Sequence, residues 1–303
     1  MAIKKGRFVA ATALALCLIP GISSAGVRIT FKLNGGWGYL GLGDVNAGTQ
    51  AFFDWALATL ASEDHTITGG YEALHWGSEF GGDLIFELSP RIGVGIGAGH
   101  LRRSNDGSPM MTIDYDSLPF YALSSKTKVS ATPLRLGLFL TLPVGRKTNL
   151  IANAGVSWYL DVKYDSSWLL TTPGTWIPEK PAQLVTTTAA NRKNPLGFQG
   201  GLGLEHLLFR KVALFIEAQG RYAKIRHLEG TTISTAYWDY FGGFFPSFSE
   251  TGTLYYESVP AIPDAPRLIM VQSSPPDGPG GEPRQAAVDF SGVSLQFGVR
   301  IRL

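Results

Sequence analysis

Long stretches of this chain alternate between apolar and polar residues with a period of two. In residues 149–164 the even positions from Leu150 to Tyr164 are all apolar, whereas the odd positions include Asn153 and Asp161. Successive side chains of a β-strand point to opposite faces, so this pattern predicts strands with one apolar and one polar face. The same alternation occurs in seven further segments, at residues 27–40, 75–88, 91–102, 128–142, 196–209, 212–225 and 287–303.

The links between these eight segments alternate in length. Short, turn-like links such as Ser89-Pro90 and Arg210-Lys211 follow the second, fourth and sixth segments. The long links cover residues 41–74, 103–127, 165–195 and 226–286. This order predicts an up-and-down antiparallel arrangement with all long loops at one end. Each segment also reaches the roughly 9 to 11 residues that a transmembrane β-strand needs.

Alternation alone does not distinguish a membrane barrel from a water-soluble barrel of the lipocalin type, whose apolar face points inward. The polar faces carry many glycines, including Gly93, Gly95, Gly97 and Gly99, which suit the narrow lumen of a small barrel. Aromatic residues gather near the long-loop ends of the apolar faces, where a strand would meet the membrane interface: Trp37, Tyr39, Trp76, Trp158, Tyr164 and Tyr222. The sequence therefore predicts an all-β, antiparallel transmembrane β-barrel of eight strands.

The first residues have the pattern of a secretory signal peptide. A basic start is followed by an apolar run at 8–19 and by small residues up to Ala25. We expect a signal peptide at 1–25 and a single outer-membrane β-barrel domain at 26–303. The one cysteine of the chain lies in the signal peptide, so no disulfide or thiol chemistry is expected after cleavage. The formal net charge of +2 is too small to indicate a nucleic-acid partner.

The end of the chain carries a further pattern. The last eight residues contain a polar residue, a glycine and two large apolar residues at alternate positions: Gln296, Gly298, Ile301 and Leu303. With the signal peptide, the eight strands and the alternating loops, the chain resembles the small outer-membrane β-barrel proteins of Gram-negative bacteria, the OmpA/OmpX/OmpW-like group. The octet is similar to that group's C-terminal assembly signal, although it ends in Leu303 rather than Phe or Trp. The resemblance implies a monomer in the cell outer membrane that contacts outer-membrane lipid and the assembly machinery.

The polar faces also carry nearly balanced charges, which the predicted barrel would direct into its lumen. An eight-stranded lumen has room for side chains but hardly for water, and buried charges must be paired. Because the first strand neighbours both the second and the last, we expect Arg300 and Arg302 to face the acidic row that begins with Glu79. A polar pore with a gate is the alternative. The predicted lumen charge network consists of Arg28, Lys32, Glu79, Asp83, Glu87, Arg135, Asp161, Lys163, Glu205, Glu217, Arg221, Arg300 and Arg302.

Two of the long loops contain local patterns. In the first, Asp44 or Asn46 could cap a short amphipathic helix. Its apolar positions follow the spacing i, i+3, i+4, i+7: Phe53, Ala56, Leu57 and Leu60. This helix could lie on the barrel mouth, at the lipid surface or against its own loops. In the last loop, 251–258 and 267–272 could extend a hairpin above the membrane or form a fifth transmembrane hairpin. Their poor alternation favours eight strands over ten.

No sequence pattern indicates catalysis, a cofactor or a metal. The sequence contains neither HExxH nor GxGxxG before a helix. His75 and His100 lie near the expected outer rim, close in sequence to Glu72, Ser78 and Ser104, but solvated loop histidines are the commoner explanation. We expect a non-enzymatic protein without a cofactor, with a structural or surface-interaction role through its extracellular loops. The alternatives are a small porin-like conduit for hydrophobic or small polar solutes and, third, an outer-membrane lipid-modifying enzyme.

Overall fold

The structure is a computed structural model that describes residues 28–60, 65–105, 107, 109–115, 118–171, 182–190, 195–235, 247–258, 267–276 and 284–303. The predicted signal peptide at 1–25 lies outside the described residues. Within them, no helix is both long and apolar enough to cross a membrane.

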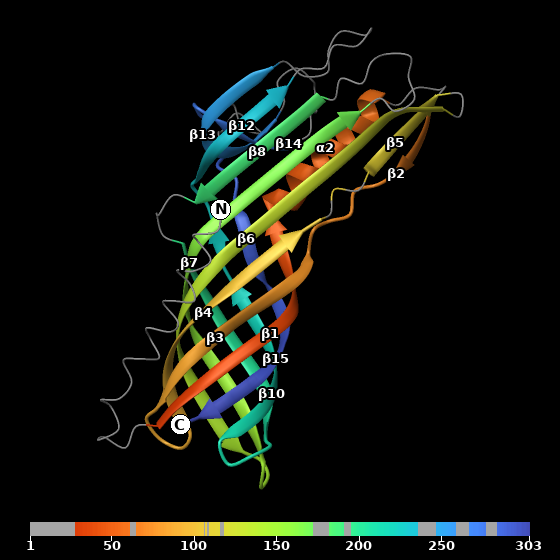
Figure 1. Cartoon of the computed structure of the whole chain (residues 1–303). Coiled ribbons are helices and arrows are strands. Elements are labelled where there is room, and N and C mark those ends of the chain that lie inside the picture. Colours follow the sequence, from red (N-terminus) through yellow and green to blue (C-terminus); the bar gives the residue numbers. More distant parts are fainter. Residues whose placement is uncertain are drawn as a thin grey trace, which may run out of the picture.

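Eight antiparallel strands close into a barrel (Figure 1). In spatial order they are β1 (Arg28–Gly43), β3 (Trp76–Glu87), β4 (Ile92–Ser104), β6 (Leu118–Pro143), β7 (Thr148–Thr171), β9 (Leu196–Leu207), β10 (Val212–Tyr222) and β15 (Val288–Arg302). The ring is continuous because β6 pairs with both β4 and β7, and β15 pairs with both β10 and β1. These strands coincide with the eight predicted segments, so the up-and-down antiparallel barrel is confirmed.

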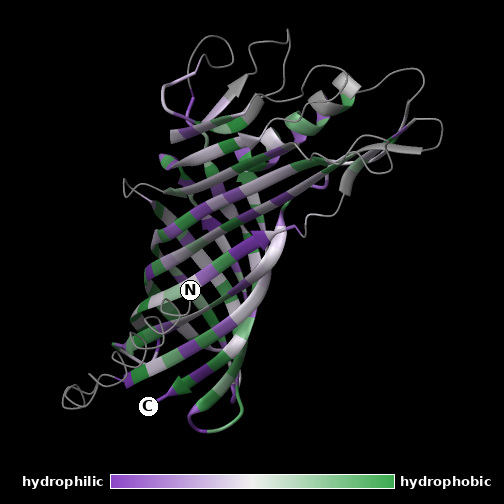
Figure 2. Cartoon of the chain, turned by 45° about the horizontal axis from the view of Figure 1, so that its top comes forward, coloured by the Kyte–Doolittle hydropathy of each residue, from purple (hydrophilic) through white to green (hydrophobic). Residues whose placement is uncertain are grey.

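Along the barrel strands, hydrophobic and hydrophilic residues alternate (Figure 2), and the exposures place the apolar side chains outside and the polar ones in the lumen. On β1, Leu33 is 56% exposed on the outside, whereas its neighbour Lys32 is 3% exposed in the lumen. On β15, Phe297 is 62% exposed and Gln296 is buried. An apolar exterior around a polar interior is the reverse of a water-soluble barrel and is the arrangement that a lipid bilayer requires. The lipocalin alternative is therefore excluded.

Strands β6 and β7 are longer than predicted and continue past the barrel into a second sheet, here called the outer sheet (Figure 1). Beyond the barrel, β7 pairs with β8 (Ala182–Ala190) instead of β9, and β6 pairs with β5 (Pro109–Tyr115) instead of β4. Further pairing adds β12 (Leu228–Thr235) and β13 (Phe248–Ser258) on one side and β2 (His65–Gly69) on the other. One hairpin thus belongs to both parts of the molecule.

The last long loop contributes a hairpin to this outer sheet. β13 pairs with β14 (Arg267–Gln272), and these two strands cover the runs at 251–258 and 267–272. β13 connects to the barrel through β12 and β8, so neither strand is part of the transmembrane ring. A short strand, β11 (Lys224–Ile225), extends the pairing with β15. The preference for eight transmembrane strands over ten is confirmed.

The predicted helix forms as α2 (Asp44–Leu60) and packs on the outer sheet. Its buried side chains include Val45, Phe52 and Phe53, and the Phe52 ring lies 4.2 Å from the ring of Trp168 on β7. The helix contacts β14 more than any other element. It therefore packs against the other loop segments. Of the predicted apolar positions whose side chains are described, Phe53 is buried and Leu57 is exposed.

A single bulge in β7 marks the boundary between barrel and outer sheet. Thr132 of β6 pairs with Leu160, but Ser130 pairs with Lys163, so one residue of β6 faces two residues of β7. Asp161, at this point, has a φ of 49°, in the left-handed region. An extra residue of this kind reverses the face on which every following side chain of the strand lies.

The side chains after the bulge are oriented accordingly. Val162 and Tyr164 are buried inside, whereas Asp161 and Lys163 are exposed on the outside. This differs from the prediction, which placed Asp161 and Lys163 in the lumen and Tyr164 among the aromatic residues of the membrane interface. In the sequence, apolar residues continue at every second position across the bulge. The alternation therefore gives no sign that the strand changes its buried face at Asp161.

Candidate functional site

The lumen of the barrel holds a series of buried ion pairs, which we take as the candidate functional site. Near its middle, Lys32 Nζ lies 2.8 Å from Glu217 Oε2, and both side chains are almost fully buried. The same ammonium lies 4.9 Å from the centroid of the Phe215 ring. Carboxylate and aromatic face together stabilise a charge that would otherwise be costly to remove from water.

A second pair joins the strands on the other side of the lumen. Arg135 Nη2 on β6 lies 3.0 Å from Asp83 Oδ1 on β3. The strand between them contributes the glycine row predicted to face the lumen, and a Cβ at Gly97 would overlap the Asp83 carboxylate. Glycine at this position is therefore needed to admit the ion pair.

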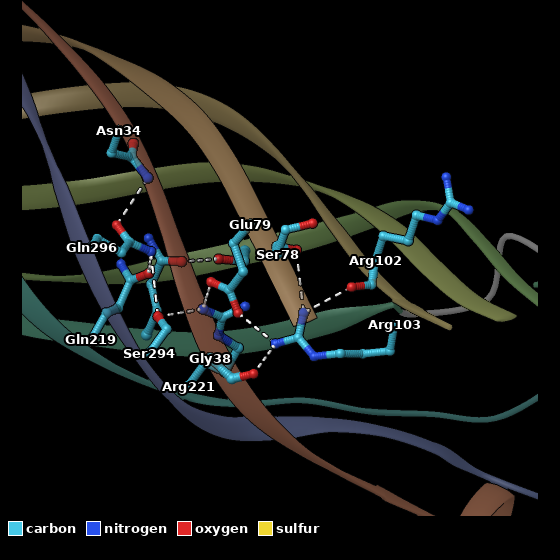
Figure 3. Close-up of polar contacts among 12 residues, drawn as sticks. Asn34, Gly38, Ser78, Glu79, Arg102, Arg103, Gln219, Arg221, Ser294 and Gln296 are labelled. Carbon is cyan, nitrogen blue, oxygen red and sulfur yellow. Dashed lines mark hydrogen bonds and ion pairs between the residues drawn. The ribbon is translucent and has the colours of Figure 1, made fainter. Parts of the chain in front are cut away.

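Glu79 is the centre of the uppermost group of charges (Figure 3). Its Oε1 accepts a hydrogen bond from Arg103 Nη2 at 2.9 Å, and its Oε2 accepts one from Arg221. Arg103 is 1% exposed and also donates to the carbonyl oxygens of Gly38 and Ser78, among others. Two cations therefore share one buried carboxylate, and backbone carbonyls satisfy much of the remaining donor capacity of Arg103.

Arg103 is a member of the network that the sequence analysis missed. The predicted strand ended at residue 102, whereas β4 continues to Ser104. The signal was present, because Arg103 falls on the same face as Gly97 and Gly99 when the alternation is extended by one step. Figure 3 shows the outcome, with Arg103 directed towards Glu79 and its neighbour Arg102 directed away from it.

Glu205 on β9 pairs with the two arginines at the end of the chain. Its Oε2 lies 2.7 Å from Arg300 Nη1, and its Oε1 pairs with Arg302. Asn149 also donates to this carboxylate, at 2.7 Å. The prediction that Arg300 and Arg302 face Glu79 and its row on β3 is not met, because these side chains reach across β10 to β9 instead of across β1.

The remaining predicted residues lie at the short-turn end. Glu87 accepts a hydrogen bond from Thr30 at 2.7 Å, and Arg28 is exposed. In the described part of the chain neither forms an ion pair. Together with Asp161 and Lys163 they are the predicted members that the structure does not bring into the buried network.

Amide side chains fill the space between the charged groups. Asn34 donates to Gln296 at 2.9 Å, and Gln296 donates to Gln219 at 2.7 Å. The cavity among these residues has a volume of about 10 Å³. A void of this size is at the lower limit of what can hold one water molecule. The space among these side chains is therefore no larger than about one water molecule.

Above Glu79 the interior changes from polar to apolar. The residues there form one buried cluster, here called the stopper, which includes Leu40, Leu42, Leu101, Val129, Tyr159, Val162, Tyr164, Ile225, Leu228, Leu254, Val271, Val288 and Phe290. They come from barrel strands, from β12 and from the β13–β14 hairpin. The Tyr159 and Phe290 rings lie 5.4 Å apart. The stopper lies at the outer end of the lumen.

A clasp joins α2 to the segment that leads into β15. Asp44 Oδ2 lies 2.9 Å from Arg284 Nη1, and its Oδ1 accepts from Arg284 Nη2 at 3.0 Å. Asp44 also accepts a hydrogen bond from the backbone N–H of Ala287 at 2.8 Å. Arg284 in turn lies 4.3 Å from the centroid of the Tyr256 ring. The first and last outer segments are thus fastened together over the stopper.

The residues of the predicted assembly signal occupy different environments. Gln296 is part of the lumen network, and a Cβ at Gly298 would overlap the carbonyl oxygen of Leu33 on β1. Ile301 and Leu303 are exposed on the outer face, on the side of the lipid. The apolar members of the octet are therefore accessible from the membrane, which a signal read by another protein would require.

The histidines near the outer rim are engaged in packing. The His75 ring stacks on Tyr39 at 4.4 Å, and its Nδ1 lies 2.8 Å from the Leu40 carbonyl oxygen. The His100 ring lies 5.3 Å from that of Phe80. Within the described residues, no hydrogen bond joins either histidine to a serine or a carboxylate, and no group of three potential metal ligands occurs.

Neither a family model nor a curated protein matches the sequence. Among solved structures, a major outer membrane protein of Thermus thermophilus is 13% identical, with a TM-score of 0.36, covering 91% of this chain and 99% of that one. OprG of Pseudomonas aeruginosa is 8% identical, with a TM-score of 0.34 and coverage of 91% and 96%. Ail of Yersinia pestis is 8% identical, with a TM-score of 0.26 and coverage of 90% and 98%. Similarities this low bear on no functional assignment.

Proposed function

We propose that this outer-membrane β-barrel is a closed, non-enzymatic anchor that holds the outer sheet at the cell surface for a structural or surface-interaction role. The observation that carries the proposal is the double closure of the lumen. Buried ion pairs fill it from Glu205 up to Glu79, and the stopper covers its outer end. A conduit would need a solvated path through both.

The outer face of the outer sheet supports the second half of the proposal. One row across β8, β12 and β13 consists of Thr187, Thr231 and Thr251, which pair in register. The hydroxyls of Thr231 and Thr251 are 3.0 Å apart and exposed. A sheet with polar groups on this face presents hydrogen-bonding partners to the outside without exposing a large apolar area.

Conductance in planar bilayers tests the closure. The wild-type protein should insert without producing steady ion channels. Stable channels with a fixed conductance would refute the closed anchor and favour the porin-like conduit, because the ion pairs would then surround a solvated path. Insertion is checked on the same samples by the difference in migration between boiled and unboiled protein on SDS gels.

Cysteine labelling tests the orientation. Because the only natural cysteine lies in the predicted signal peptide, a Thr231→Cys variant carries a single thiol on the outer sheet. A membrane-impermeant maleimide should label it on intact cells. The matched control is Gly145→Cys in the short β6–β7 turn, which should react only after the membrane is permeabilised. The opposite pattern would place the outer sheet on the inside and refute the surface role.

A further inference from the structure

A group of cations lies on the outside of the barrel wall, just beyond the apolar band. Arg102 on β4 pairs in register with Ser130 on β6, and Ser130 pairs with Lys163 on β7. Lys128 lies two residues beyond Ser130 on the same face. Neighbouring strands are about 4.8 Å apart and alternate residues of a strand about 7 Å apart. The Cα atoms of the three residues therefore lie about 8 to 10 Å from one another around Ser130. We name Arg102, Lys128 and Lys163 the rim triad.

The rim triad lies at the level where lipid headgroups begin. The outward residues just before it are Leu160 and Trp158 on β7, which are 48% and 39% exposed. Tryptophan at the edge of an apolar band marks the membrane interface. Lys163 is the next outward side chain after the bulge, so its ammonium stands where the hydrocarbon region ends.

The triad has no internal partner for its charge. Arg102 and Lys163 are exposed, and within the described residues no member of the triad forms an ion pair. Asp161 is two residues from Lys163, and Asp165 pairs in register with Lys128. Neither carboxylate lies within ion-pair distance of these cations. Lys126, two residues beyond Lys128, adds a fourth positive charge. Four cations against two carboxylates leave this face with a net charge of +2.

The opposite wall of the barrel is different. There, Lys224 Nζ lies 3.7 Å from Asp289 Oδ2, and Arg284 is held by Asp44. Of the exposed cations at the same level of that wall, only Arg226 forms no ion pair among the described residues, and it stands alone. The β4–β6–β7 wall instead groups several uncompensated cations at headgroup level, where an anion from outside the chain can bind them together.

We propose that the rim triad binds the phosphate group of an outer-leaflet lipid, whose acyl chains would lie along the apolar surface that contains Trp158. Three cations around one point match a compact anion with several oxygens, and the adjacent apolar surface matches its attached chains. This selects a membrane lipid over soluble phosphate. The proposal rests on the placement of the barrel in the membrane and is independent of whether the lumen conducts.

The test uses the folded full-length protein in detergent and counts bound lipid by native mass spectrometry. The probes are lipid A with both phosphates and the same lipid after removal of the phosphates. The wild type should retain the phosphorylated form at least about tenfold better, and the preference should weaken in high salt. The variant R102Q/K128Q/K163Q should lose the preference, and R102K/K128R/K163R should keep it.

The matched control is Lys224→Gln on the opposite wall, which should bind like the wild type. All variants should keep the wild-type shift between boiled and unboiled migration, since the substituted side chains point away from the lumen. Equal retention of both lipids by the wild type, or an unchanged preference in the glutamine variant, would overturn the proposal. Displacement of the lipid by millimolar inorganic phosphate would show that the site selects free phosphate and would also overturn it.

Discussion

The barrel and the outer sheet are built from the same β6–β7 hairpin, yet they are inside out relative to each other. Before the bulge, β7 directs Asn153 inward and Trp158 outward. After it, the strand directs Tyr164 inward and Lys163 outward. The difference lies in the surroundings, because lipid encloses the lower part and water the upper part. The comparison teaches that a period of two identifies a strand, whereas the solvent and the bulge decide which face is buried.

Each half is stabilised by what its surroundings do not provide. Lipid chains are as apolar as the outward side chains, so exchanging a protein contact for a lipid contact outside the barrel changes the free energy little. The specificity of folding therefore comes from buried pairs such as Arg300 with Glu205. In water, burial of apolar surface is the main favourable term, and the stopper supplies it. Substitutions of the same chemical kind should therefore have different effects in the two halves.

The largest effect should follow insertion of one residue after Asp161, which shifts the strand by one position beyond the bulge. Every later side chain of β7 would change face, which would bury Lys163 and expose Val162 and Tyr164. We expect the outer sheet to lose more than about 5 kcal/mol and to unfold, since a buried unpaired charge and lost core contacts add together. Protease digestion of the intact cell surface measures this.

The control for the insertion is Asp161→Gly, which keeps the number of residues and suits the positive φ at this position. It should be as protease-resistant as the wild type. If the insertion variant were equally resistant, the number of residues at the bulge would not set the orientation of the strand.

Next in size is Glu205→Gln, which leaves the buried Arg300 and the half-buried Arg302 without a counterion. Breaking a buried pair in this way costs about 3 to 5 kcal/mol. The midpoint of urea unfolding should fall accordingly, whereas Glu72→Gln on an exposed segment should leave it unchanged. The triple variant E205Q/R300Q/R302Q should recover much of the loss, because no uncompensated charge remains. A triple variant less stable than the single one would argue against pairing as the cause.

A smaller effect compares one substitution on the two sides of the same wall. Ile225 is buried in the stopper, and Ile216 on β10 is 48% exposed to lipid. Ile225→Val should cost about 1 kcal/mol, since it leaves a small cavity. Ile216→Val should change the free energy of unfolding by less than about 0.5 kcal/mol, because lipid fills the space. Equal costs at both positions would contradict the different roles of the two faces.

The smallest effect appears only in alkali. Burial raises the pKa of Tyr71 and of Tyr164 to about 12, and both lie in the outer part of the molecule. Their folded pKa exceeds the unfolded value of about 10, so their contribution is complete below pH 10 and is lost as the pH rises towards 12. Absorbance at 295 nm should show Tyr71 and Tyr164 ionising later than the exposed tyrosines, and Tyr164→Phe should remove one late ionisation. Ionisation of all tyrosines near pH 10 would mean that the outer part is open.

The sequence predicts the barrel well because its strands alternate without interruption over their whole length. It predicts the outer sheet less well, since the upper part of β6 has serine or lysine on both faces, as at Ser125 and Lys126. Which residues face the lumen follows largely from the alternation along each strand, but which of them form ion pairs with one another does not. Arg300 reaches Glu205 two strands away, and this depends on strand tilt and side-chain length, which alternation does not contain.

The clasp between Asp44 and Arg284 has a consequence for the order of folding. The two residues are 240 positions apart, on segments next to the first and last strands of the ring. The clasp alone would close a loop of 240 residues, so the entropy of loop closure favours its formation together with the pairing of β15 and β1. Fastening of the outer part is therefore a late step, and a chain stalled with an open barrel would display an unfastened helix that surface proteases could recognise.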